Sequence, residues 1–152
     1  MAEYIYNSIQ TLQPGQAALL EDAIPCNKGY VVHREGSGIL TLRGIIRNSC
    51  GKFARYRVSF DGNIAVPEGG TAGEIQLAIA IGGEVVPTSI AAATPTSAQA
   101  YWNVAGFAVI DVPAGCCYTV AVENASVSAD PTTTPASALN VRNLNVEVSR
   151  IA

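Results

Sequence analysis

Hydrophobic and polar residues alternate in short runs along most of the chain, and no long segment repeats with the 3.6-residue period of a helix. The clearest case is the run 53–60, where Tyr56, Val58 and Phe60 fall on one side of an extended strand and polar or charged residues fall on the other. Such runs are separated by clusters of Gly, Pro and Asn, which is typical of a sandwich or barrel. The pattern predicts an all-β chain of strands and turns.

Nine runs have the composition and length of strands, namely 4–12, 30–33, 39–46, 53–60, 74–81, 84–87, 102–112, 116–123 and 139–151. The segment 17–23 fits either a helical turn or a further short strand. The stretches 91–100 and 126–137 are poor in large apolar residues and are expected to be loops. Gly82-Gly83 predicts a tight hairpin turn, because glycine readily adopts the positive φ that such a turn needs.

The chain has 152 residues, within the usual range for one domain, and no linker or repeat divides it. We therefore predict a single domain over 1–152. The longest aliphatic stretch, 75–86, is interrupted by polar residues and glycines, and the first residues have no basic and apolar pattern, so neither a membrane segment nor a signal peptide is expected.

Charged residues make up only 14% of the chain, against about 25% in an ordinary soluble domain, whereas 49% are hydrophobic. This balance predicts that part of the surface is covered by another chain. The net charge of −3 argues against binding nucleic acid, which requires a basic patch or stripe.

Four cysteines stand at Cys26, Cys50, Cys116 and Cys117, and their spacing fits neither a zinc module nor a dense disulfide framework. Adjacent residues of a strand point to opposite faces, so at most one of Cys116 and Cys117 can face the core. A bridge from Cys26 or Cys50 to one of that pair stays open, but buried free thiols are the favoured interpretation.

Few residues offer catalytic or metal-binding chemistry. His33 is the only histidine, so any histidine-dependent catalytic device would run through it, and we interpret it instead as a strand-end histidine held by a turn. The sequence predicts no enzyme. Asp61, Glu68 and Glu74 flank a glycine-rich loop and are the candidates for a calcium site, although they lack the dense spacing of acidic ligands. Ordinary solvated loop carboxylates are the alternative, and no other cofactor is indicated.

Several segments together resemble a known family. The runs 55–60, 75–79 with the Gly-Gly turn after it, 106–110, 112–115 and 118–120, followed by a terminal aliphatic strand, resemble the globular heads of the tumour necrosis factor and complement superfamily. The resemblance covers about residues 53–151. It implies a jelly-roll sandwich of about ten strands that forms tight homotrimers, with the N- and C-terminal strands side by side near the three-fold axis. The Gly-Cys-Cys-x-Thr-Val run at 115–120 and the long neutral loops are similar to a small bacterial and phage branch of fibre heads and capsid decorations, and the chain lacks the Gly-X-Y stalk of filament versions.

If the chain forms a homotrimer, aromatic and paired charged residues are the candidates for its interface. The predicted interface residues are Tyr4, Tyr6, Arg55, Arg57, Tyr118, Glu123 and Glu147. Among them, the two arginines and the two glutamates are expected on one outward face, either as pairs between subunits or as a solvated sheet face. Tyr101 and Trp102 form a candidate platform for stacking a sugar, with packing at a subunit seam as the alternative, and Phe107 is interpreted as a core residue.

Two functions follow from these expectations. The first is a non-enzymatic structural protein whose homotrimer decorates or caps a larger assembly, a phage virion assembled in the host cytoplasm, with other virion or surface-assembly proteins as partners. The second is the head of a fibre or adhesin that binds a cell-surface glycan or receptor. Aromatic and polar side chains exposed on the loops near 88–104 and 124–138 would favour the second.

Overall fold

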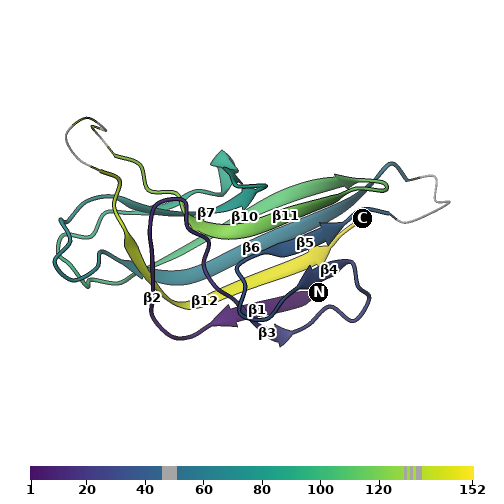
Figure 1. Cartoon of the computed structure of the whole chain (residues 1–152), viewed down its shortest axis with the longest axis horizontal. Coiled ribbons are helices and arrows are strands. Elements are labelled where there is room, and N and C mark those ends of the chain that lie inside the picture. The colour runs from purple at the N-terminus through teal and green to yellow at the C-terminus, as the bar shows by residue number, and fades with distance from the viewer. Residues whose placement is uncertain (46–50, 129, 131, 133–134) are drawn as a thin grey trace.

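Two antiparallel sheets packed face to face make up the structure, a computed structural model that describes residues 1–45, 51–128, 130, 132 and 135–152 (Figure 1). Within these residues there are twelve strands and one short 3-10 helix, Pro87–Ser89. The predicted all-β class is confirmed, with more short strands than expected. No helix in the described part of the chain is long and apolar enough to cross a membrane.

The first sheet brings both ends of the chain together. Its strands, in spatial order, are β10 (Trp102–Pro113), β6 (Phe53–Ala65), β12 (Leu139–Arg150), β1 (Ala2–Tyr6) and β3 (Glu21–Ile24), while β2 (Gln10–Leu12) also pairs with β12. In the pairing of β1 with β12, Ala2 lies opposite Val148. The N- and C-terminal strands are therefore side by side, and the two termini lie at the same end of the sandwich (Figure 1).

The second sheet is built from residues in the middle of the chain. Its strands, in spatial order, are β4 (Val31–His33), β5 (Leu40–Arg43), β11 (Cys117–Asn124), β7 (Ile75–Ile81) and β8 (Glu84–Val85), while β9 (Ala91–Ala93) also pairs with β7. β7 and β8 form the hairpin predicted at Gly82-Gly83, and both glycines have positive φ.

Alternate side chains of the two sheets meet in the core. The inward-pointing, buried residues of β6 and β12 include Tyr56, Val58, Phe60, Leu144, Val146 and Val148. From the second sheet come, among others, Leu42, Ile75, Leu77, Ile79, Val120 and Val122. The period-two pattern of the sequence therefore identifies the inner face of these strands correctly.

Strand boundaries differ from the prediction at the start of the chain. The expected strand 4–12 is two strands, β1 and β2, both paired with β12. β12 itself is irregular between Arg142 and Asn145, where Asn143 has a φ of 51°. A residue in the left-handed region bends its strand. Opposite this bend, the pairing of β12 passes from β1, which ends at Tyr6, to β2, which begins at Gln10. The segment 17–23 contributes to β3, which supports the short-strand alternative.

The predicted loop 91–100 is also partly wrong. Its first three residues form β9, where three alanines pair with β7 from Ile75 to Leu77. Alanine has little side chain to bury, but its main chain pairs as well as any other, so composition alone did not reveal this strand. In the described part of 126–137 no strand or helix is present, as predicted.

Candidate functional site

The outward side of β10 and β6 carries exposed apolar side chains on an otherwise polar sheet. We call this surface the β10 face and define it by Phe107, Val109 and Asp111 of β10 with Arg55 and Arg57 of β6. Phe107 is 54% exposed and Val109 is 53% exposed, although both belong to the central stretch of β10. Because the residues between them point into the core, the strand cannot bury both sets within one chain.

Arginine side chains border the aromatic rings of this surface. The guanidinium of Arg57 lies 5.0 Å from the ring centre of Phe107, and that of Arg55 lies 4.9 Å from the ring of Phe53. Both distances fit a cation–π contact. Aromatic residues and arginine are the types enriched in protein interfaces, so the β10 face has the composition of a contact surface.

An ion pair fixes one end of the β10 face. Arg55 donates from Nε to Oδ1 of Asp111 at 2.7 Å and from a terminal nitrogen to Oδ2 at 2.8 Å. The hydrogen bonds from Arg55 hold the pKa of the Asp111 carboxyl below its usual range. Both side chains remain partly exposed, so the pair orients the surface more than it stabilises the fold.

A shallow hollow adjoins this surface at the edge of the sheet. It measures about 310 Å³ and is lined by residues of β6 and β10, among them Ser59, Asp61, Gly106 and Phe107. Gly106 lies where a larger residue would meet the main-chain oxygen of Ser89 and the ring of Phe60. The hollow is therefore shaped by the close packing beneath it.

The prediction that two arginines and two glutamates share one outward face is wrong. Arg55, Arg57 and Glu147 lie on the first sheet, but Glu123 belongs to β11 of the second sheet and is only 7% exposed. Arg55 pairs with Asp111 instead of a glutamate, because β10 is its neighbour in the sheet. Glu147 accepts a hydrogen bond from Ser149 at 3.1 Å.

The three predicted interface tyrosines also separate. Tyr4 is 1% exposed within one chain, so its side chain has almost no surface to offer another subunit. Tyr6 of β1 and Tyr118 of β11 are half-buried and lie on different sheets. Phe107, interpreted as a core residue, is exposed. Both phases of β10 carry apolar side chains, so the period-two pattern alone did not place Phe107 outside.

The two residues of the candidate sugar platform, Tyr101 and Trp102, differ in how far their rings are exposed. The ring of Tyr101 is covered by Arg142, whose guanidinium lies 3.9 Å from its centre. Trp102, the first residue of β10, is 52% exposed and pairs with Ile64 of β6. Only Trp102 therefore presents a free aromatic surface at this end of the sheet.

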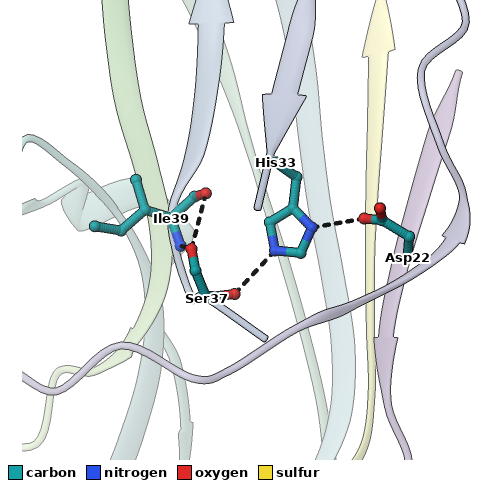
Figure 2. Close-up of polar contacts among 4 residues, drawn as sticks. All are labelled: Asp22, His33, Ser37 and Ile39. Atoms are coloured by element: carbon teal, nitrogen blue, oxygen red, sulfur yellow. Dashed lines mark hydrogen bonds and ion pairs between the residues drawn. The ribbon is translucent and has the colours of Figure 1, made fainter. Parts of the chain in front are cut away.

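His33 is engaged in structural contacts. Its Nδ1 lies 2.6 Å from Oδ1 of Asp22, and its Nε2 lies 2.9 Å from the main-chain oxygen of Ser37 (Figure 2). The hydroxyl of Ser37 is turned to the main chain of Ile39 instead. The ring is 2% exposed and packs edge-on against Tyr4 with ring centres 4.9 Å apart. The interpretation of His33 as a strand-end histidine held by a turn is confirmed.

Burial of Tyr4 beside this cluster has an electrostatic consequence. Desolvation, with a smaller contribution from the carboxylate of Asp22, raises the pKa of Tyr4 to about 12. The phenol therefore stays neutral where an exposed tyrosine would begin to ionise.

The candidate calcium ligands do not come together. Asp61 lies within β6, while Glu68 and Glu74 lie in the segment after it, and no group of three acidic, histidine or cysteine side chains among the described residues could hold a metal ion. Cys116 and Cys117 are both exposed and free, and Cys26 is half-buried and free. The expected burial is wrong for the first two because they begin a strand at a turn. Cys50 lies outside the described residues.

Comparison with known proteins bears on the fold. No family model and no curated protein matches the sequence. Among solved structures, the Eiger TNF of S. frugiperda is similar at 11% identity and a TM-score of 0.63, over 99% of this chain and 91% of that one. The globular domain of a zebrafish complement 1qA protein is similar at 16% identity and a TM-score of 0.52, over 97% and 96%. The predicted jelly roll of this type is confirmed.

Proposed function

We propose that this protein is a non-enzymatic structural protein that acts by self-assembly, as a homotrimer packed through the β10 face. The observation that carries the proposal is the pair Phe107 and Val109, each more than half exposed on a regular strand at the edge of the sheet. A long exposed edge strand with apolar side chains invites association with other chains. Closed three-fold symmetry would cover that surface on all three copies.

Two further features favour assembly over catalysis. The chain has few charges and many apolar residues, which fits a surface partly covered by other copies. Both ring nitrogens of the only histidine are engaged, one with the carboxylate of Asp22 and the other with the main-chain oxygen of Ser37. Neither nitrogen is therefore free to activate a nucleophile.

The role of the β10 face is tested by Val109→Ser, with Val127→Ser as the matched control. Both valines are exposed. Val109 lies on β10, and Val127 lies in the segment that follows β11. The two changes replace the same side chain, but only the first lies on the proposed interface. We expect Val109→Ser to shift sedimentation toward the monomer and Val127→Ser to leave it unchanged. Equal behaviour of the two variants would overturn the assignment.

We further propose that the trimer decorates or caps a phage virion and reaches it in the host cytoplasm. Its support is the sequence resemblance to small phage fibre heads and capsid decorations and the low content of charged residues, which fits a surface covered by a permanent partner. Particles purified by density gradient from lysed host cells should contain the protein at a fixed ratio to the major capsid protein. Recovery of the protein only in the soluble fraction of the lysate would contradict this location.

Exposed Trp102 favours a second candidate function, the binding of a cell-surface glycan. Stacking of a sugar ring needs one free aromatic face, and Trp102 is 52% exposed at the end of β10. It is also the only tryptophan in the chain, so its fluorescence reports directly on this position. A saturable change in tryptophan fluorescence on adding a glycan would support this function. The control is a non-carbohydrate solute at the same refractive index, which should cause no saturable change. Glycan binding that persists in Trp102→Ala would exclude this residue as the platform.

A further inference from the structure

Glu123 is the buried charge that the fold leaves without a partner. It lies on the outer side of β11 and is 7% exposed, yet among the described residues its carboxyl group accepts no hydrogen bond and forms no ion pair. Burying an unpaired carboxylate is costly, because no protein group replaces the water it loses. Burial accordingly raises the pKa of Glu123.

This carboxyl group lines a small pocket on the outer face of the second sheet. The pocket measures about 140 Å³, and its walls are mainly small or aliphatic: Ala17, Ile39, Ala80, Gly83, Thr119, Val120 and Ala121. No lining residue is basic. Because no buried side-chain oxygen in the described structure lacks a partner entirely, the Glu123 oxygens keep a little exposure, and that exposure opens to the pocket.

The local pairing explains why the site is preformed. β11 pairs with β7, which places Ala78 opposite Glu123, and on the other side Ala17 forms an isolated bridge to Glu123. Ala17 and, further along β7, Ala80 line the pocket, and their small side chains leave space beside the carboxyl group. A larger residue at Ala17 or Ala80 would fill that space, and Ile39 and Gly83, which lie outside the strands, complete the walls.

We propose that this pocket receives the side chain of a lysine from a partner protein. The walls fit an aliphatic stem of four methylene groups, and the carboxylate of Glu123 fits the ammonium group at its end. The volume is below the range of about 300–1,000 Å³ typical of small-molecule sites, so it suits one side chain. The pocket is on the sheet opposite the β10 face, and the proposal does not depend on the trimer.

The test uses n-butylammonium, which has the stem and the charge of a lysine side chain without its main chain. Amide signals of the intact protein are followed by NMR during titration, with n-butanol as the uncharged control. We expect saturable shifts at Ala17, Ala80 and Ala121 with the ammonium only. Equal shifts with n-butanol, or no saturable shift at all, would overturn the proposal.

Glu123→Gln is the variant that removes the charge and preserves the shape. It should weaken n-butylammonium binding at least about tenfold, the usual effect of losing a charge-assisted hydrogen bond. Glu84→Gln is the matched control, because Glu84 is an exposed carboxylate of the adjacent hairpin. It should bind as the unaltered protein does. Equal weakening in both variants would mean that net charge, and not the pocket, attracts the ligand.

A second probe separates a protein partner from a free amine. Lysine capped as N-acetyl and N-methylamide carries the same side chain on a peptide main chain. We expect it to bind as well as n-butylammonium and to shift the same amides. Binding of n-butylammonium without binding of capped lysine would exclude a protein-borne lysine. The mass of Glu123→Gln in solution should equal that of the unaltered protein, so failure here is distinguishable from failure of the trimer.

Discussion

The buried phenol of Tyr4 makes the stability of this protein depend on alkaline pH. Its pKa is about 12 in the folded chain, against 10.0 for a free tyrosine. The folded state therefore prefers the neutral phenol, and the stability that this group contributes is fully present below pH 10. It is lost progressively as the pH rises from 10 to about 12.

The size of the effect follows from the shift. Each pKa unit corresponds to about 1.4 kcal/mol, so two units correspond to about 3 kcal/mol of unfolding free energy. At about pH 11, roughly half of this should already be lost. Burial also raises the pKa values of Tyr30 and Tyr56, so the unaltered protein should lose more than Tyr4 alone explains.

The variant Tyr4→Phe isolates the contribution of this one hydroxyl. Urea unfolding at neutral pH and at about pH 11, at one fixed protein concentration, gives the loss of unfolding free energy for each protein. We expect a loss smaller in Tyr4→Phe than in the unaltered chain by one to two kcal/mol, on the order of half the full shift. Tyr101→Phe, a change outside the core, is the control and should lose as much as the unaltered protein.

An identical alkaline loss in Tyr4→Phe and the unaltered protein would refute this reasoning. It would mean that the phenol is hydrated in the folded state. The same experiment therefore tests the burial of Tyr4 in the core of one chain.

Two further substitutions test the packing beneath the β10 face. Gly106→Ala should destabilise the fold by about 1–3 kcal/mol, because its new methyl group would lie 2.5 Å from the main-chain oxygen of Ser89 and 2.8 Å from the ring of Phe60. Gly73→Ala is the control and should change the stability little, because its methyl group would meet nothing within 4 Å. Urea unfolding measures the free energy of unfolding of both variants. Ser89→Ala should cost about 1–3 kcal/mol in the same assay, because the buried hydroxyl accepts a hydrogen bond from the Ile79 amide at 2.9 Å; an unchanged midpoint would show that water replaces it.

Much of the fold follows from local pattern, and the failures are non-local. The alternation of 53–60 places Tyr56 and Val58 in the core without knowledge of their partners. In β10 both phases carry apolar side chains, so Phe107 could not be assigned to a face until the sheet order was known. Arg55 meets Asp111 because β10 neighbours β6, and no spacing in the sequence specifies that neighbour.

The candidate sites show the same limit. Composition predicts that some surface is covered by another chain, but it cannot specify which part of the surface. The unpaired carboxyl of Glu123 depends on Ala17, more than a hundred residues away in the chain, forming a bridge beside it. Alanines such as Ala17 and Ala80 are common in a sequence, and only their placement around a buried carboxylate makes a pocket.

The trimer is the central claim, and the mass of the protein in solution tests it most directly. Light scattering on a size-exclusion column, at low protein concentration and with and without reductant, gives that mass independently of shape. We predict three times the chain mass of 15.8 kDa, unchanged by reductant because the association does not require the exposed thiols. A mass of one chain at every concentration would contradict the assembly through the β10 face.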